Sequence, residues 1–375
     1  MESKTQIYPV AIVGGGLAGL CAAIHLQKEG KQVILFEKKQ YPFHRVCGEY
    51  VSNETRKYLK KIGLNLDELG VQEIQKFQFT SPSGGSLTSP LDLGGFGISR
   101  YTLDNELYKL ALASGVDCRV NTEVEQITFE KNLFKIQTSH SNDPIQAQYV
   151  IGSYGKRSKI DVTLNRNHLT RRSPYIGIKY HINYDYPKDL ISLHNFENGY
   201  CGISAIEDNK YCLCYLTTRE NLRKYKNVSE MERNILWKNP HLKKIFLEAE
   251  FLYQKPEVIN EISFSPKTQV ENHILMIGDT AGLITPLCGN GMAMAIHGAK
   301  ILSELLLKNF DNRTFVERQY QKAWKNNFGF RVWAGRQIQS LFGHPILTEF
   351  VLHFFKLFRP ALSIFIKATH GKEFS

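Results

Sequence analysis

Three glycines and one acid near the start of the chain are spaced to bind a dinucleotide. Gly14, Gly16 and Gly19 make the pattern G-x-G-x-x-G, and Glu37 follows eighteen residues after the last of them. The first glycine permits a tight turn, the second lets the backbone approach a pyrophosphate, and the third lets a helix pack closely on a strand. Glu37 is suited to accept hydrogen bonds from ribose hydroxyls and would repel a 2′-phosphate. The spacing therefore predicts FAD or NAD rather than NADP.

Apolar runs on either side of the glycines supply the elements that would position them. Residues 8–13 and 32–36 are predicted strands, and residues 17–29 between them are a predicted helix. Because the helix begins at the glycine turn, its N-terminal N–H groups and its dipole point toward the phosphates. This order of elements predicts a Rossmann-type unit, whose expected cofactor contacts are Gly14, Gly16, Leu17, Ala18, Gly19, Glu37 and Lys38.

A second glycine-flanked acid lies near the other end of the chain. Asp279 follows Gly278 and the predicted buried strand 273–277, where it could hold a polyol hydroxyl. Gly289 and Gly291 then precede a predicted helix, whose dipole suits an electron-rich group such as the edge of a flavin ring. One site built from two distant segments implies an elongated cofactor, and FAD is long enough. The expected contacts here are Gly278, Asp279, Gly289, Asn290 and Gly291.

Length and cysteine content indicate a reduced protein with several structural units. A chain of 375 residues with 42% hydrophobic content can bury more than one core, so two or three units are expected. The seven cysteines include no C-x-x-C pair, which favours free thiols in a cytoplasmic protein over disulfides or a metal site. No metal-binding residues are therefore expected. No secretory signal is predicted either, because the glycine turn interrupts the first apolar stretch.

Positive charge is concentrated near the C-terminus. The chain carries a net charge of +11, and residues 318–372 contain nine basic residues and one acid, Glu349. No nucleic-acid-binding module accompanies them, so no nucleic-acid partner is expected. The interleaved aromatic and aliphatic residues favour an anionic membrane surface or a hydrophobic small-molecule or lipid substrate, while an ordinary solvated face is an equal alternative.

Residues 346–366 are predicted to form an amphipathic helix and not a membrane span. Charged residues interrupt the apolar ones, and Pro360 should kink or split the helix. The helix is predicted either to lie on a membrane interface or to pack on the inserted domain. The protein is thus expected in the cytoplasm, either free or peripheral on the inner face of the membrane. The apolar side of its helical wheel comprises Leu347, Val351, Phe354, Phe355, Phe358, Leu362 and Phe365.

The order of predicted elements gives an α/β fold with an inserted sheet. A discontinuous, Rossmann-type FAD-binding domain is assigned to residues 1–74, 99–173 and 265–310. Alternating β-type runs predict a mainly antiparallel β-sheet substrate domain over 75–98 and 174–264. A C-terminal helical region is expected over 311–375.

Together the motifs resemble the FAD-dependent family that includes p-hydroxybenzoate hydroxylase, and within it the geranylgeranyl reductase branch. The resemblance covers nearly the whole chain and implies a glutathione reductase-like FAD domain. Residues 99–107 are similar to a helix start whose arginine reaches the FAD, and residues 122–124 to a strand that borders the adenine. The cofactor contacts that the resemblance adds are Arg45, Arg100, Val124 and Pro286.

Arg45-Val46-Cys47-Gly48-Glu49 is similar to the cysteine-glycine motif of the geranylgeranyl reductases, in which the cysteine lies beside the flavin ring. The likeness implies that Cys47 lines the flavin site, as a proton donor or as a steric element; ordinary packing of a small buried residue is the alternative. Glu49 is the second candidate for a catalytic proton donor, and a solvated loop carboxylate is the alternative there.

Two stretches depart from the family pattern. Tyr154 stands where the family has an acid, which bears on how a nicotinamide would dock. Residues 200–205 correspond to the reductase motif Tyr-x-Trp-x-Phe-Pro, but keep only its tyrosine and have small residues in place of the bulky ones. The resemblance implies a substrate pocket at Tyr200, Gly202 and Ser204, for a substrate that differs in width or chemistry.

Three classes of function follow. The first is an FAD-dependent oxidoreductase that reduces C=C bonds of a hydrophobic, prenyl-type chain, with NAD(P)H or a protein electron carrier as the reductant. The second is a flavin monooxygenase that hydroxylates an apolar aromatic or quinone-like substrate. The third is a non-catalytic FAD-binding protein, which the two intact cofactor motifs disfavour. The sequence indicates no particular oligomeric state.

Overall fold

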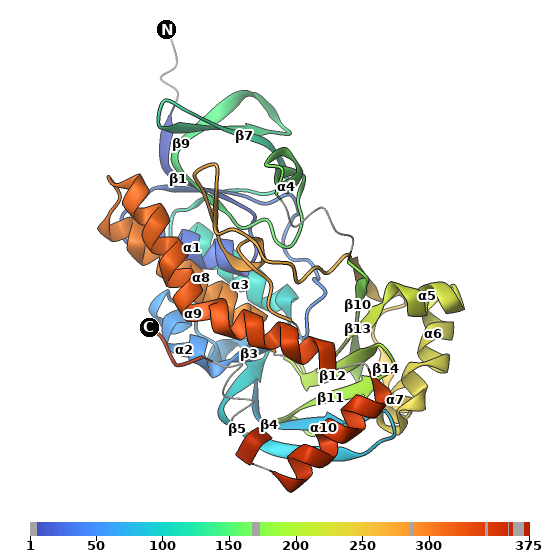
Figure 1. Ribbon diagram of the computed structural model, residues 1–375. Coiled ribbons are helices and arrows are strands. Elements are labelled where there is room, and N and C mark those ends of the chain that lie inside the picture. The colour runs from blue at the N-terminus through green and yellow to red at the C-terminus, as the bar shows by residue number, and fades with distance from the viewer. Residues whose placement is uncertain (1–5, 167–172, 286–288, 342–343, 359, 363–370) are drawn as a thin grey trace.

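Two sheets and the helices that cover them form the molecule (Figure 1). The computed structural model describes residues 6–166, 173–285, 289–341, 344–358, 360–362 and 371–375. The predicted α/β fold is confirmed: one sheet carries the glycine motifs, the other is mainly antiparallel, and helices follow at the C-terminus.

The first sheet has the strand order β16-β17-β9-β1-β2-β6. Its parallel strands are β1 Ile7–Val13, β2 Val33–Phe36, β6 Asp117–Arg119, β9 Ser141–Gly152 and β17 Ile274–Met276. The antiparallel strand β16 Val270–Glu271 pairs with β17, and the hairpin of β7 Val124–Glu130 and β8 Leu133–Thr138 pairs with β9.

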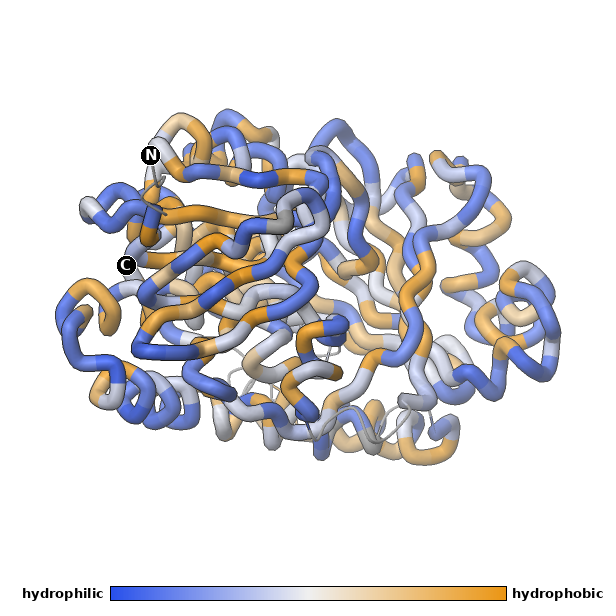
Figure 2. Tube along the Cα trace, turned by 90° about the horizontal axis from the view of Figure 1, so that it is seen from above, coloured by the Kyte–Doolittle hydropathy of each residue, from blue (hydrophilic) through white to orange (hydrophobic). Residues whose placement is uncertain are grey.

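Alternation along the strands gives this sheet two buried faces. Ile12 of β1 packs in a core with α1 Leu17–Lys28, α2 Arg56–Lys61, α3 Arg100–Ala113 and α8 Gly291–Lys308. Its neighbours Ala11 and Val13 face the opposite side, where the β7–β8 hairpin and α4 Lys159–Thr163 cover the sheet. In the view from above, hydrophobic and hydrophilic residues alternate along the hairpin (Figure 2). Parallel strands place the loops that follow β1, β9 and β17 at one edge, where nucleotides bind.

The second sheet has the order β14-β10-β13-β12-β11-β4-β5-β3, and β15 pairs with β10. Its early strands are β3 Tyr50–Ser52, β4 Gln72–Thr80 and β5 Ser86–Gly97. The later ones are β10 Tyr175–Asn183, β11 Leu190–Phe196, β12 Gly199–Ala205, β13 Tyr211–Thr218, β14 Glu250–Phe251 and β15 Glu257–Asn260. All pairs are antiparallel except β4 with β11. The sheet thus includes β3, which lies within the stretch that the sequence assigned to the FAD-binding domain.

Three short helices cover one face of this sheet. They are α5 Arg219–Tyr225, α6 Val228–Asn234 and α7 Pro240–Glu248, and residues such as Ile178, Tyr180 and Leu213 pack against them. The apolar spacing of residues 229–246 in the sequence predicts a single helix here. The chain divides it because Asn239 caps a new helix with its side chain and Pro240 occupies the first turn.

The C-terminal helices run along one side of both sheets (Figure 1). α9 Arg313–Leu341 packs on α8, and α10 Pro345–Leu357 lies against β5. α10 ends before Pro360, as a helix approaching a proline should. In the described part of the chain, no helix is both long and apolar enough to cross a membrane.

Candidate functional site

The first glycine turn leaves no room for side chains except at one point. A Cβ on Gly14, whose φ is 104°, would lie 2.3 Å from the carbonyl oxygen of Ser153. A Cβ on Gly19 would lie 2.1 Å from the carbonyl oxygen of Gly14, so strand and helix approach as the motif requires. At Gly16 a Cβ would meet nothing nearer than 3.9 Å, and the groups it would meet are two guanidinium groups. The turn therefore opens onto a cationic space.

The two guanidinium groups belong to Arg45 and Arg100, and acids hold them in place. Asp104 accepts hydrogen bonds from Arg100 at 2.7 and 2.8 Å and from Arg45 at 3.2 Å. Arg45 also lies 3.3 Å from Glu37, which is buried and accepts the N–H of Gly15 at 3.0 Å. Glu37 thus lies beside the glycine turn, where a ribose contact is expected.

The two distant glycine motifs meet in space. A Cβ on Gly278 would lie 3.1 Å from the Cβ of Ala18, so the start of the second motif contacts the start of α1. A small cavity beside Asp279 is lined by Gly291, where α8 begins, and by Trp324 of α9. Both motifs therefore border one site, as an elongated cofactor requires.

The electrostatics around Asp279 suit a diphosphate. Burial raises the pKa of this carboxyl above its ordinary value. Four cations offset part of that rise: Lys267, Arg100, Lys156 and Arg45. Lys267 donates to the carbonyl oxygens of Lys156 and Asp279, each at 2.8 Å, and burial lowers the pKa of both lysines to about 8. Because Arg45 and Arg100 also face Asp104 and Glu37, these four cations exceed the three nearby carboxylates by one positive charge. Together with the open space at Gly16, this arrangement fits FAD.

The remaining predicted contacts are placed as follows. Leu17 and Val124 are buried at the starts of α1 and β7, and Lys38 is exposed beside Glu37. Asn290 is buried next to the first residue of α8. Pro286 lies outside the described residues.

The loop with Cys47 lies between the two sheets, and the second sheet holds it by its backbone. Cys212 of β13 donates to the carbonyl oxygen of Cys47, and Ser204 of β12 donates to that of Gly48, both at 3.3 Å. Cys47 itself is half-buried. Burial raises the pKa of its thiol, against the opposite effect of Arg100. At neutral pH the thiol is therefore protonated.

Glu49 is buried and ionised. Its carboxylate lies 2.5 Å from the Lys179 amine and 2.6 Å from Nε2 of His181, and it accepts the backbone N–H of Arg100 at 2.8 Å. Burial raises its pKa, but Lys179 and His181 outweigh burial and bring the pKa to about 2. A carboxylate with this pKa has no proton to donate near neutral pH. The geometry therefore favours a role for Glu49 in holding the loop in place. Glu49 fits neither the predicted role of proton donor nor the alternative of a solvated loop carboxylate.

A hydrogen-bonded chain of side chains leads from Glu49 toward the surface. The sequence motifs did not predict this chain. His181 Nδ1 lies 2.8 Å from the Tyr253 hydroxyl, which in turn lies 3.1 Å from Nδ1 of half-buried His44. Because Nε2 of His181 faces a carboxylate, it carries the proton there, and Nδ1 then accepts from Tyr253. The sequence feature that could have indicated it is the alternation of Lys179 and His181 with apolar residues along β10.

Three side chains of this region could reach a common metal ion. Ligand atoms of Glu49, His181 and Cys212 all lie within 4.8 Å of one another. Lys179 already neutralises Glu49, and burial raises the pKa of Cys212 well above its ordinary value, so that its thiol stays protonated. As they stand, Cys212 donates to the carbonyl oxygen of Cys47 and His181 lies within hydrogen-bond distance of Glu49, so these side chains belong to one hydrogen-bonded network.

The predicted substrate residues lie on the face of the second sheet that covers the Cys47 loop. Tyr200, Gly202 and Ser204 alternate along β12, and Ser204 contacts the loop directly. Tyr200 is buried in an apolar cluster, which we define by the residues Phe79, Leu87, Leu193, Tyr200, Leu216, Ile262, Leu352 and Leu362.

The loop that contains Tyr154 is held by hydrogen bonds, although Tyr154 stands where the family has an acid. Its hydroxyl donates to the sulfur of Met276 at 3.3 Å, and the next N–H, of Gly155, bonds to the Thr280 hydroxyl at 2.9 Å. The loop after β9 is thus tied to the second glycine motif.

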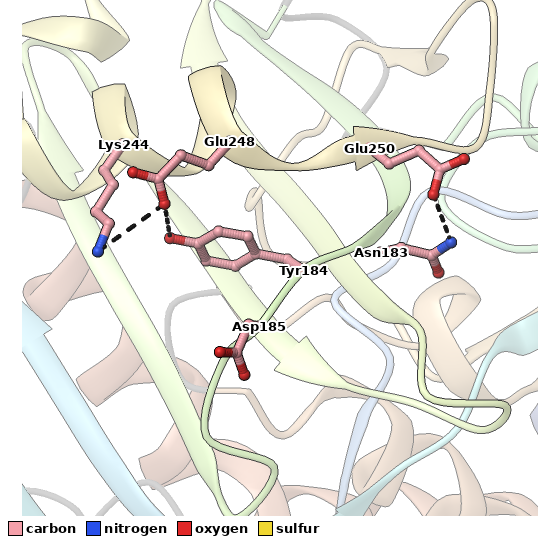
Figure 3. Close-up of a pocket in the computed structure, with 6 residues that line it drawn as sticks. All are labelled: Asn183, Tyr184, Asp185, Lys244, Glu248 and Glu250. Atoms are coloured by element: carbon pink, nitrogen blue, oxygen red, sulfur yellow. Dashed lines mark hydrogen bonds and ion pairs between the residues drawn. The ribbon is translucent and has the colours of Figure 1, made fainter.

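A separate surface pocket lies beyond the end of β10 (Figure 3). Two of its acids have partners: Glu248 lies 3.4 Å from the Tyr184 hydroxyl and 3.9 Å from Lys244, and Glu250 accepts from Asn183 at 2.9 Å. It shares no residue with the cofactor site and offers no reactive group.

Comparisons with known proteins agree with the fold and with FAD as the cofactor. The family described as FAD binding domain matches residues 7–313. Conditioned medium factor receptor 1 of Dictyostelium discoideum is 27% identical over 367 residues, covering 86% of this chain and 68% of that protein. Digeranylgeranylglycerophospholipid reductase of Methanosarcina acetivorans is 26% identical, covering 86% and 82%. The solved structure of the flavin-dependent halogenase CmlS has a TM-score of 0.76 at 18% identity, covering 88% of this chain and 64% of that one.

Proposed function

The chain belongs to the family described as FAD binding domain and is an FAD-dependent oxidoreductase, and we propose that it reduces C=C bonds in a hydrophobic, prenyl-type chain. Its similarity to a digeranylgeranylglycerophospholipid reductase supports a lipid-like substrate. The reductant proposed is NAD(P)H or a protein electron carrier.

One observation carries the proposal: apolar residues extend from the Cys47 loop to α10. Gly177 of β10 would place a Cβ 3.1–3.2 Å from Val46, Ile259 and Ile262, so the loop meets the apolar cluster there. The cluster also contacts Leu283, in the loop after Asp279, and includes Leu352 of α10. A chain of carbon atoms reaching this loop would thus be surrounded by apolar side chains.

The residues around the site suit reduction of a double bond. When bound, FAD supplies the hydride. Glu37 would hold the ribose, and Arg100 with Lys267 would neutralise the diphosphate. The second hydrogen must arrive as a proton, and the protonated Sγ of Cys47 can give one, whereas the ionised Glu49 cannot. The chain of His44, Tyr253 and His181 leads from the surface to the Glu49 carboxylate beside that loop.

A direct test is to reduce the purified, FAD-loaded protein with NADH or NADPH under anaerobic conditions and then add geranylgeraniol. Gain of two hydrogens per reduced bond in the product, seen by mass spectrometry, would support the proposal. The alternative, a flavin monooxygenase acting on an apolar aromatic or quinone-like substrate, predicts no such product. It predicts instead that a phenol or quinone gains one oxygen atom when air is admitted. Protein that binds FAD but is not reduced by either nucleotide or by dithionite would point to a non-catalytic role.

A further inference from the structure

Helix α10 has two apolar faces, whereas the sequence pattern predicted one. Its inner face packs Leu352 into the apolar cluster, with Phe355 beside it. Thr348 is buried on the same side, and the Glu349 carboxylate accepts the N–H of Ser83 at 3.2 Å. The helix is therefore fixed to the second sheet by its inner face, in agreement with one of the two predicted alternatives.

The opposite face of α10 is apolar and exposed. Five large residues, each three or four positions from another of the set, form what we call the outer stripe: Ile346, Phe350, Phe354, Leu357 and Phe358, which are 78%, 69%, 43%, 80% and 58% exposed. Single exposed apolar residues are ordinary, but a contiguous stripe of this kind marks an interaction surface. The inner packing is complete without it, so the stripe is not needed for the fold.

Charge around the stripe is positive. Lys356 and His353 are exposed on the same helix. Glu349, the one acid among residues 318–372, is turned inward, where hydrogen bonds from Ser83 and Ser81 offset burial and lower its pKa. Among the described residues, the outer side of α10 thus offers the Lys356 cation and apolar groups and no carboxylate.

We propose that the outer stripe of α10 docks the protein on an anionic lipid bilayer. Large apolar side chains flanked by a lysine are the composition of helices that lie in the membrane interface. A second copy of the chain is a poorer occupant, because a two-fold contact through the stripe would bring Lys356 close to its own copy. Anionic headgroups attract the same charges, at about 1 kcal/mol for each cation near the surface. This inference does not depend on the identity of the substrate.

Docking in this orientation would place the apolar cluster directly behind the membrane-facing helix. Leu352 of the cluster and Phe350 of the stripe lie on opposite sides of the same turn. Within the described part of the chain, a hydrophobic molecule leaving the bilayer would meet α10 before it reached the cluster.

Co-sedimentation of the full-length, FAD-loaded protein with vesicles tests the proposal. Phosphatidylcholine vesicles containing phosphatidylglycerol should bind it more strongly than pure phosphatidylcholine, and added salt should weaken binding. The variant Phe350→Asp/Leu357→Asp should bind at least about tenfold more weakly, because both side chains would leave the apolar phase. Flavin absorbance and thermal unfolding check that the variant is folded.

The matched control is Leu247→Asp/Phe315→Asp, which replaces two exposed apolar residues on α7 and α9 and changes net charge equally. Its vesicle binding should remain close to that of the natural chain. Equal loss in both double variants, or no binding to anionic vesicles at low salt, would overturn the proposal. So would a dimer in light scattering that Phe350→Asp/Leu357→Asp dissociates while vesicles bind neither protein, because the occupant would then be a second copy.

Discussion

Two buried glutamates lie on opposite faces of the second sheet, and their surroundings differ. Glu49 faces Lys179 and His181, and the charge of Lys179 together with hydrogen bonds from both side chains outweighs burial and lowers the pKa of Glu49 to about 2. Glu232 of α6 lies on the other face, where two tyrosine hydroxyls donate to it and burial raises its pKa. The surroundings of Glu49 stabilise its ionised form, whereas those of Glu232 favour its protonated form.

The difference separates a functional face from a packing face. A buried ion pair contributes little net stability compared with apolar residues of similar volume. Strands β10, β12 and β13 nevertheless present Lys179, His181 and Ser204 to the Cys47 loop, and present Ile178, Tyr180 and Leu213 to the helices. We infer that the charged side serves the cofactor site and the apolar side supports the sheet. Four substitutions would break or sharpen this contrast.

The largest effect is expected for Lys179→Met. Methionine fills a similar volume but leaves the Glu49 carboxylate buried without its cation, which should lower the free energy of unfolding by about 3–5 kcal/mol. Urea denaturation at neutral pH measures it. Lys210→Met, at an exposed lysine paired with Asp208, is the control and should change stability by less than about 0.5 kcal/mol. Equal effects of the two substitutions would contradict the buried ion pair.

How far the sequence could predict this site depends on the range of the contacts. The cofactor motifs were readable because Gly14 to Glu37 form one local unit, whose spacing follows from strand and helix geometry. Glu49 and Lys179 are 130 residues apart, and nothing in either neighbourhood indicates that they meet. The apolar pattern of α10 was recognised, but its two faces depend on which residues the second sheet covers, and the helical wheel cannot show that. The division at Asn239 was local and could have been read from the Asn-Pro pair.

Cys47→Ser tests the functional face, and Cys201→Ser is its counterpart on the packing face. The first variant should retain FAD, because Cys47 is not among the nearest contacts of the motif glycines, but turnover should fall at least about tenfold, since a serine hydroxyl is a much weaker acid. Cys201 is fully buried, so its serine variant should lose about 1–3 kcal/mol of stability and keep the turnover of the folded protein. If turnover of Cys47→Ser were unchanged across the pH range, Cys47 would serve only in packing and not as a proton donor.

Glu232→Gln should stabilise the protein at neutral pH by up to about 1 kcal/mol, because a neutral amide avoids burying a charge and its oxygen can still accept from the tyrosines. The folded-state pKa of Glu232 is raised, so the folded state binds more protons than the unfolded state above the ordinary pKa of 4.5. The advantage of the variant should therefore shrink as pH falls toward that value. For Glu49→Gln the sign is opposite: the stability that Glu49 contributes is present above about 4.5 and is lost as pH falls toward about 2. If the stability difference from the natural chain changed with pH in the same direction for both variants, the contrast between the two faces would be wrong.

The smallest effect on stability is expected for Tyr253→Phe, which interrupts the chain from His44 to Glu49 and leaves the ring in place. His181 would lose the hydroxyl that fixes its Nδ1 as an acceptor, so its imidazole ¹⁵N shifts should change. If the chain replenishes protons at the site, turnover should fall by less than about tenfold, with a shifted pH profile and a larger solvent deuterium effect. Tyr101→Phe, whose ring stacks on His44, is the control and should leave both unchanged. Altered shifts with an unchanged pH profile would mean that Tyr253 only orients His181.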